Sequence, residues 1–200
     1  MILVRTPDAA PQPWKNGGGV TRELLRLPAD GGDDWTLRIS VADIAADGPF
    51  SPFAGVTRWF AVLDGAGVRL AFPDRTLDVR RGDAPLRFDG AAAPGCALLG
   101  GPTRDLNVMV RSARAQSLVT AASFLDEAEP GTCAGFGFFA LQPLALHGAG
   151  ALPVALPALS LAWCETPFDA SHAWWVEPVD DAAPGHGLPG YWIRLLPHAP

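Results

Sequence analysis

The chain has 200 residues, of which 48% are hydrophobic, so it can bury a large core without disulfides or a structural metal. Its net charge of −6 argues against nucleic-acid binding, which needs a basic surface. The 22 glycines and 20 prolines interrupt any long helical pattern and predict an all-β protein of short strands joined by turns.

Strand-like patterns follow one another through the first half of the chain. Residues 20–27 come after a glycine triplet, and residues 35–42 alternate between apolar and other side chains. Residues 58–63 and 67–72 flank the short loop 64–66, which predicts a β-hairpin. Further short strands are predicted at 77–80, 85–88, 96–99 and 105–111.

The composition changes after Ser112. Beyond Arg114 the sequence contains a single Lys or Arg, which is Arg194. Strands are predicted there at 135–141, 159–163, 174–177 and 191–195. Regular short strands with turn signals indicate a sandwich or a barrel. A domain boundary near residues 112–116 fits these patterns, and a single sheet system shared by both halves is equally compatible.

The cysteines and the apolar segments indicate the cellular compartment. The three cysteines are odd in number and far apart, which predicts buried free thiols in a reducing compartment. Residues 130–164 lack Asp, Glu, Lys and Arg, but their prolines would break a membrane-spanning helix. The apolar start of the chain is too short for a secretory signal. We therefore predict a cytoplasmic protein that does not bind membranes.

The segment WKNGGGVTRE, residues 14–23, is the most unusual in the chain. Three consecutive glycines let the backbone approach another group closely, and Lys15, Asn16 and Thr21 add hydrogen-bond donors. The segment does not match a phosphate-binding GxxxxGK[ST] loop. It predicts either a loop that binds a small molecule or a tight turn into an edge strand.

Polar side chains also recur at every second position of two predicted strands. Arg38 and Ser40 share one face of their strand, as do Asn107, Met109 and Arg111 on theirs. Such a face is ordinarily solvated. Because these polar residues are mixed with apolar ones, the lining of a small cavity is the alternative.

Histidines are missing from the first 146 residues. None of the four histidines, which are His147, His172, His186 and His198, stands at HxH or HxxxH spacing from another. We therefore predict that the protein needs neither a metal nor another cofactor. Glu23, Asp47, Asp64 and Asp105 are candidate functional carboxylates, although most are expected in turns or caps.

Three stretches in the first half together resemble the HutD family, whose relatives include the Ves proteins of enteric bacteria. They are WKNGGGVTRELLRLP (14–28), WTLRISVADIAADGPFSPFAGVTRWFAVLDGAGVRL (35–70) and GGPTRDLNVMVRSA (100–113). The resemblance is dense from Trp14 to Arg111 and weak from there to Pro200. The combination is specific, whereas any one stretch alone is not.

The resemblance implies a cupin-like (RmlC-like jelly-roll) fold with two antiparallel β-barrels in one chain, a bicupin. The first barrel is expected in residues 1–112, and the second, which can share strands with the first, in residues 113–200. It also implies a link to histidine catabolism, in which members restrain pathway expression without being pathway enzymes. N-formylglutamate and urocanate are plausible ligands. Metal-binding cupins use two or three histidines and a glutamate in short motifs, and this sequence lacks those histidines. The motif positions are Trp14, Asn16, Gly17, Gly18, Gly19, Thr21, Glu23, Arg38, Ser40, Asp47, Gly48, Pro49, Phe50, Ser51, Phe53, Arg58, Asp105, Asn107, Met109 and Arg111.

We therefore predict a non-catalytic regulator or metabolite sensor, a monomer or homodimer, that binds a small anionic metabolite. The guanidinium groups of Arg38, Arg58 and Arg111 would hold a carboxylate, and the glycine loop would offer bare backbone to it. The predicted ligand-binding residues are Lys15, Asn16, Gly17, Gly18, Gly19, Thr21, Glu23, Arg38, Ser40, Phe50, Ser51, Phe53, Arg58, Asn107, Met109 and Arg111.

Two other functions stay open. One is a metal-independent isomerase or hydrolase of a histidine-derived acid, with Glu23 as general base. Neighbouring arginines would keep that carboxylate ionised, which weakens it as a base near pH 7. The other is a protein-interaction module with exposed Trp174, Trp175 and Trp192, although tryptophans in strands lie more often in the core.

Overall fold

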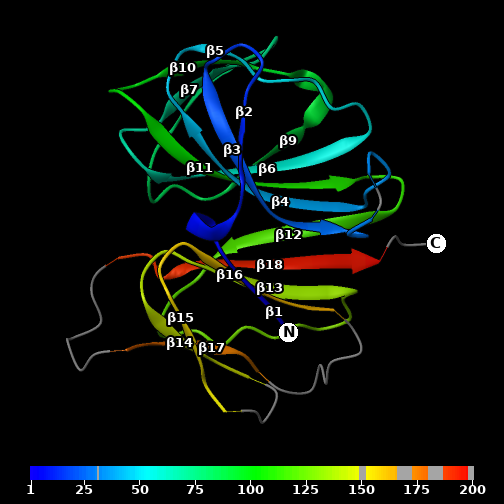
Figure 1. The fold of residues 1–200 in the computed structure, drawn as a ribbon, viewed down its shortest axis with the longest axis vertical. Coiled ribbons are helices and arrows are strands. Elements are labelled where there is room, and N and C mark those ends of the chain that lie inside the picture. The colour runs from blue at the N-terminus through cyan, green and yellow to red at the C-terminus, as the bar shows by residue number, and fades with distance from the viewer. Residues whose placement is uncertain (31, 149–151, 166–172, 180–186, 198–200) are drawn as a thin grey trace. The chain divides into compact units, whose positions relative to one another are not determined.

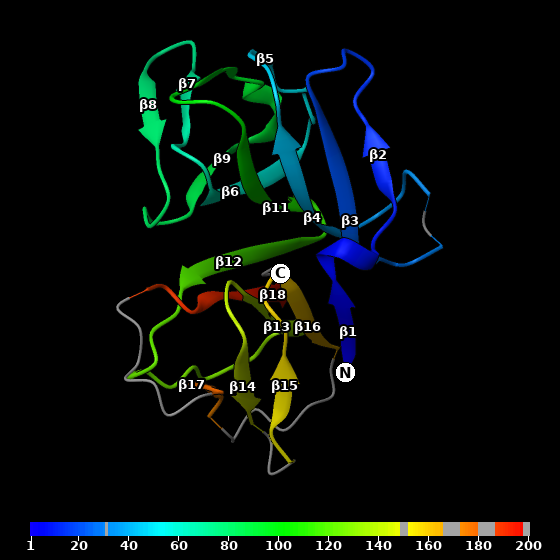
Figure 2. The ribbon, with the colours of Figure 1, turned by 60° about the vertical axis from the view of Figure 1, so that its left-hand side comes forward.

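The computed structural model describes residues 1–30, 32–148, 152–165, 173–179 and 187–197. It forms two compact units, an N-terminal unit of Ala9–Gln116 and a C-terminal unit of Met1–Asp8 with Ser117–Pro200. In the described ranges the regular structure is β-strand apart from two 3-10 turns, η1 (Thr6–Asp8) and η2 (Gly90–Ala92), as Figures 1 and 2 show. The all-β prediction is confirmed. No helix in these ranges is long and apolar enough to span a membrane.

The N-terminal unit contains a six-stranded antiparallel sheet. In spatial order its strands are β2 (Pro11–Pro13), β3 (Gly19–Leu27), β4 (Leu37–Ile44), β11 (Thr103–Arg111), β6 (Val56–Asp64) and β9 (Leu86–Asp89). The central strands β4 and β11 carry apolar side chains on one face, where Leu37, Ile39 and Val41 are fully buried. Their other face carries the polar side chains, so the alternation predicted for residues 35–42 and 105–111 is confirmed.

A second sheet of the same unit has four strands. They are β5 (Gly48–Pro49), β10 (Gly95–Leu98), β7 (Val68–Ala71) and β8 (Thr76–Val79). Side chains from both sheets meet in one hydrophobic cluster, for example Phe60 and Val62 of β6 with Leu70 of β7 and Cys96 of β10. The two sheets of this unit therefore pack face to face over a shared core.

The hairpin predicted between residues 58–63 and 67–72 is wrong. β6 pairs with β11 and β9, whereas β7 pairs with β10 and β8 in the other sheet. Gly65 and Gly67 lie between the two strands with φ angles of +89° and +101°. These left-handed conformations, which suit glycine, carry the chain from one sheet into the other instead of folding it back.

The C-terminal unit has a five-stranded and a three-stranded sheet. The strands of the larger sheet are, in spatial order, β1 (Ile2–Arg5), β16 (Ser160–Glu165), β13 (Gly135–Ala140), β18 (Gly190–Pro197) and β12 (Ala115–Ala121). The strands of the smaller sheet are β15 (Val154–Leu156), β14 (Leu144–His147) and β17 (Trp175–Pro178), as Figure 2 shows. The first residues of the chain, which the sequence placed with the N-terminal half, belong to this unit because β1 pairs with β16.

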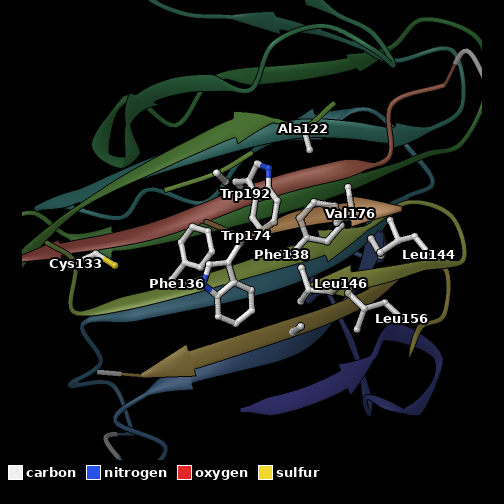
Figure 3. Close-up of a cluster of buried hydrophobic side chains, with 13 residues drawn as sticks. Ala122, Cys133, Phe136, Phe138, Leu144, Leu146, Leu156, Trp174, Val176 and Trp192 are labelled. Atoms are coloured by element: carbon white, nitrogen blue, oxygen red, sulfur yellow. The ribbon is translucent and has the colours of Figure 1, made fainter. Parts of the chain in front are cut away.

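Aromatic side chains fill the core of the C-terminal unit, as Figure 3 shows. Phe136 stacks on Trp192 with ring centroids 5.2 Å apart and meets the edge of Trp174 at 5.6 Å. Trp174 and Trp192 are only 7% and 5% exposed, so the hypothesis that they form an exposed partner-binding surface is wrong. Trp175 is half-buried and stacks on His147.

The cysteines agree with the prediction of unpaired thiols. Cys96 and Cys133 are buried, Cys164 is half-buried, and all three are free. Burial raises the pKa of each thiol, so all three stay protonated at neutral pH.

Candidate functional site

A cavity of about 660 Å³ lies in the N-terminal unit. One wall is the polar face of β3, β4, β11 and β6, and the rest comes from β2 and from the segments around Lys15 and Phe50. Its volume is in the range of small-molecule sites. The lining residues are Gln12, Pro13, Trp14, Lys15, Asn16, Thr21, Arg38, Ser40, Ala42, Pro49, Phe50, Ser51, Pro52, Phe53, Arg58, Asn107 and Met109.

Strand register brings the polar side chains of the sheet together. Ser40 of β4 lies opposite Asn107 of β11, and Arg38 lies opposite Met109. On the other side of β11, Arg58 of β6 also lies opposite Met109. Directly paired residues project from the same face of a sheet, so these side chains share one wall. The period-2 spacing in the sequence predicts this arrangement for all of them except Arg58, which lies on a third strand.

Arg58 is the most deeply buried cation of the lining, with 7% of its surface exposed. Its Nε donates a hydrogen bond to Oδ1 of Asn107 at 2.7 Å, and its guanidinium carbon lies 4.3 Å from the ring centroid of Phe50. Within the described residues, Nη1 and Nη2 of Arg58 have no hydrogen-bond partner. Burial lowers the pKa of Arg58 to about 10, against a smaller opposing effect of Asp105, so Arg58 stays charged at neutral pH.

Arg38 is held in place by Glu23, which lies outside the lining. The Arg38 Nε donates to Oε2 of Glu23 at 2.6 Å, and Arg26 donates to both carboxylate oxygens of Glu23. Burial raises the pKa of Glu23, but the hydrogen bonds from Arg26 and Arg38 and their charges outweigh it, so the pKa lies below its ordinary value. Glu23 is therefore an ion-pair partner that positions Arg38, and its low pKa argues against the general-base hypothesis.

The lining is positively charged although the whole protein is acidic. It contains Lys15, Arg38 and Arg58, and none of its residues is Asp, Glu, His, Cys or Tyr. The protein as a whole carries a net charge of −6. The positive charges that line a concave, partly apolar site strengthen the positive electrostatic potential inside it, which attracts a negatively charged ligand. This cavity is suited to a small anion with an apolar part.

The glycine loop shapes the cavity without lining it. The Gly17 N–H donates to the Trp14 carbonyl, and the Gly18 N–H donates to Oδ1 of Asn16 at 3.0 Å. A Cβ at Gly19 would lie 2.5 Å from the Asp43 carbonyl oxygen, so this position requires glycine. The expectation that the loop offers bare backbone to a ligand is wrong for Gly17 and Gly18, whose amides are already used. The loop instead presents the side chains of Lys15 and Asn16.

Arg111 does not reach the cavity, in contrast to the prediction. It is the last residue of β11, and its Nη2 donates to the Asp33 carbonyl at 2.7 Å. Its guanidinium carbon lies 5.0 Å from the ring centroid of Trp35. Of the other predicted residues, Lys15, Asn16, Thr21, Arg38, Ser40, Phe50, Ser51, Phe53, Arg58, Asn107 and Met109 all line the cavity.

The sequence did not identify part of the rim. Gln12 and Pro13 lie on β2, which pairs with β3, but a short segment with two prolines does not read as a strand. Trp14 matches the family motif, and its indole Nε1 donates to Oγ1 of Thr21 at 2.8 Å. That bond fixes the ring at the cavity wall, so the occurrence of Trp14 and Thr21 in one family motif was the available signal.

The histidines give no metal site in the part of the chain that the structure describes. There, His, Cys, Asp and Glu side chains do not gather in groups of three that could hold a metal ion. Nε2 of His147 lies 3.0 Å from Oε2 of Glu177 in the C-terminal unit. His172, His186 and His198 lie outside the described residues.

The structure is an all-β fold with cupin-like neighbours among solved structures. Its fold is similar to that of an oxalate decarboxylase from Bacillus subtilis, with a TM-score of 0.63, 8% identity, and coverage of 98% of this chain and 77% of that one. Residues 6–172 match the profile described as HutD, so the chain belongs to the HutD family. The resemblance seen in the sequence is confirmed.

Relatives of the same family agree with this assignment. An uncharacterized 21.2 kDa protein in the hutC 3' region of Pseudomonas putida is 40% identical over 107 residues, 54% of this chain and 56% of its own. Protein Ves of Citrobacter koseri is 34% identical over 110 residues, 54% of this chain and 57% of its own. The chain spans about half the length of the curated relatives it matches.

A conserved protein of unknown function from Pseudomonas aeruginosa PAO1 is similar in structure. It has a TM-score of 0.79 and 27% identity, covering 99% of this chain and 98% of that one. HutD from Pseudomonas fluorescens SBW25, solved in a formate condition, has a TM-score of 0.78 and 24% identity, with 99% of each chain covered. The similarity in fold therefore extends over nearly the whole chain.

Proposed function

We propose that this protein is a non-catalytic, ligand-binding member of the HutD family that binds a small carboxylate in the N-terminal cavity. The observation that carries the proposal is Arg58, a buried cation at the cavity with two unpartnered terminal nitrogens. Buried charges in proteins are normally paired, because an unpaired one is costly. A bound carboxylate would supply the missing partner in the bidentate geometry that guanidinium groups favour.

The remaining lining suits an acid with a flat or extended apolar part. Phe50, Phe53 and Met109 provide apolar surface, and Ser40 and Thr21 provide hydroxyl groups that can orient a polar end. Arg38 and Lys15 offer a second positive region for a second carboxylate. N-formylglutamate, a dicarboxylate, and urocanate, a monocarboxylate with a flat ring, both fit this description and follow from the family's link to histidine utilisation.

The experiment is a calorimetric titration of the purified protein with N-formylglutamate and with urocanate at pH 7. We expect at least one of the acids to bind with a stoichiometry of one, and the amide of that acid, which lacks the charge, to bind much more weakly. A ligand present at one hundred times its Kd should also stabilise the fold by about 2.7 kcal/mol, which raises Tm measurably. If neither acid gives heat or a shift of Tm, the proposed ligand class is wrong.

We further propose that ligand binding makes the protein a regulator that limits histidine utilisation. The support is family membership and the similarity to a protein from the hutC 3' region. Deleting the gene should raise expression of the histidine-utilisation genes in cells that grow on histidine, and the wild-type gene should restore it. Unchanged expression in the deletion strain would contradict this role.

We also infer that the two units are two cupin barrels in one chain. Each unit has two antiparallel sheets, and the similarity in fold to the oxalate decarboxylase extends over 98% of the chain.

A further inference from the structure

Asp105 lies on the same face of β11 as Asn107, opposite Ala42 of the cavity lining, and takes no part in the proposed carboxylate contacts. It is a β11 residue with 0% exposure and is not among the residues that line the cavity. Its Oδ1 accepts a hydrogen bond from Nδ2 of Asn107. Its Oδ2 is buried and, among the described residues, has no hydrogen-bond partner. A fully buried carboxyl group with one unused oxygen needs an explanation.

The hydrogen bonds connect Asp105 to the cavity through one intermediate. Asn107 donates to Asp105 with its amide nitrogen and accepts from Nε of Arg58 with its amide oxygen at 2.7 Å. An asparagine amide has one acceptor oxygen and one donor nitrogen. Because Asp105 accepts the hydrogen bond from the amide nitrogen of Asn107, the amide oxygen of Asn107 must face Arg58. If the amide were reversed, two donors would face each other at Arg58 and the bond would be lost.

The direction of Arg58 therefore depends on this chain of side chains. With Nε fixed by Asn107 and the guanidinium carbon lying over the Phe50 ring, Nη1 and Nη2 remain for a ligand. Phe88 supports the guanidinium at 5.5 Å. The arrangement holds a charged group in one orientation before any ligand arrives, which reduces the ordering cost of binding.

We propose that Asp105 is a positioning residue of the anion site: it orients Arg58 through Asn107, and its proton is coupled to the anion in the cavity. The first half of this proposal concerns the protein without ligand. The second half rests on the proposed function.

The charged groups around Asp105 support the coupling. Burial raises the pKa of Asp105 to about 8, the charge of Arg58 and the hydrogen bond from Asn107 lower it in part, and Asp43 of β4 raises it. Cys96 of β10 also faces the pair, but burial and the charge of Asp105 raise its pKa to about 12. Among these groups, Asp105 is the one expected to titrate between pH 7 and pH 9.

The sign of the effect follows from electrostatic repulsion. An anion held by Arg58 disfavours a negative charge on Asp105, so binding raises the pKa of Asp105 and takes up a proton above pH 7. By linkage, the affinity for the anion falls as the pH rises through about 8, by up to about tenfold per pH unit above that value. Deprotonation of Arg58, with a pKa of about 10, would act in the same direction only at higher pH.

The test uses two substitutions at this position and one matched control. Asp105→Asn keeps an oxygen that accepts from Asn107 and cannot ionise, whereas Asp105→Ala removes the acceptor. Asp78→Asn makes the same chemical substitution at an exposed carboxylate that pairs with Arg69 and Arg80. NMR without ligand follows the Nε–H signal of Arg58 and the carboxyl carbon of Asp105 from pH 6.5 to pH 9. Calorimetry at pH 8.5, in buffers of different ionisation enthalpy, counts the protons taken up with whichever acid binds.

We expect the Arg58 Nε–H signal to be shifted or lost in Asp105→Ala and retained in Asp105→Asn and Asp78→Asn. Wild type and Asp78→Asn should take up about half to one proton on binding, and Asp105→Asn should bind the acid with no proton uptake. An unchanged Arg58 signal in Asp105→Ala would overturn the positioning role. Equal proton uptake in wild type and Asp105→Asn would overturn the coupling. If neither acid binds the wild type, the proposed function fails and the coupling with it, while the Arg58 signal still decides the positioning role.

Discussion

Replacing Arg58 by methionine should remove most of the carboxylate affinity of the cavity. Methionine keeps an unbranched apolar stem against Phe50 but has no charge and no hydrogen-bond donor. Losing a charged partner of a buried carboxylate costs roughly 2–5 kcal/mol of binding, which corresponds to about 30- to 4,000-fold in Kd. Calorimetric titration of the variant with the acid that binds the wild type measures this loss.

Arg111 provides the matched control. The sequence places it on the same strand face as Asn107 and Met109, but its guanidinium contacts Trp35 and the Asp33 carbonyl instead of the cavity. Arg111→Ala should therefore bind the acid with the wild-type Kd. The account would be contradicted if folded Arg58→Met bound like the wild type, or if Arg111→Ala lost as much affinity as Arg58→Met.

Replacing Trp163 by alanine should strongly destabilise the C-terminal unit. Trp163 is 0% exposed, and its ring packs against β13 at two glycines. A Cβ at Gly135 would lie 2.3 Å from the Trp163 ring, so the indole fills the space that a side chain at this position of β13 would need. Truncating a buried tryptophan costs about 3–5 kcal/mol, because the cavity left behind cannot close fully. Urea unfolding with an unchanged m-value would report this as a lower midpoint.

Trp175→Ala is the control for the same chemical change at a less buried site. Trp175 is half-buried and stacks on His147 at 4.9 Å. We expect a loss of about 1 kcal/mol, which is typical of an aromatic pair. Equal losses of stability in the two variants would mean that the packing around Trp163 is not tight.

The sequence predicted the strands of the fold better than their partners. Alternation located β4 and β11 because a two-residue period follows directly from strand geometry. It did not show that residues 58–63 and 67–72 join different sheets, because a short glycine loop permits either a hairpin or a crossing. The sequence did not predict β1 for another reason. Its pairing with β16 joins residues about 160 positions apart, and a local sequence pattern cannot indicate such a pairing.

The candidate site was predictable where it depends on strand faces and family motifs. Arg38, Ser40, Asn107 and Met109 follow from the two-residue period, and Lys15 and Asn16 follow from their place as donors beside the glycine triplet. The two-residue period places Arg111 on the same strand face as Met109. The prediction that Arg111 lines the cavity is wrong, because a side chain at the end of a strand is free to turn away from that face. The sequence marks Asp105 as a candidate carboxylate and a motif position but does not predict its complete burial, because burial depends on what packs over β11 and not on neighbouring residues.

We expect a small carboxylate to bind in the N-terminal cavity beside Arg58. Titration of the protein with N-formylglutamate and urocanate, followed by NMR of the tryptophan indole signals and the Arg58 Nε–H, tests it most directly. Trp14 lines the cavity, whereas Trp174 and Trp192 lie in the core of the C-terminal unit. We predict saturable shifts of the Trp14 and Arg58 signals with those of Trp174 and Trp192 unchanged. Shifts confined to Trp174 and Trp192, or no saturable shift with either acid, would contradict the claim.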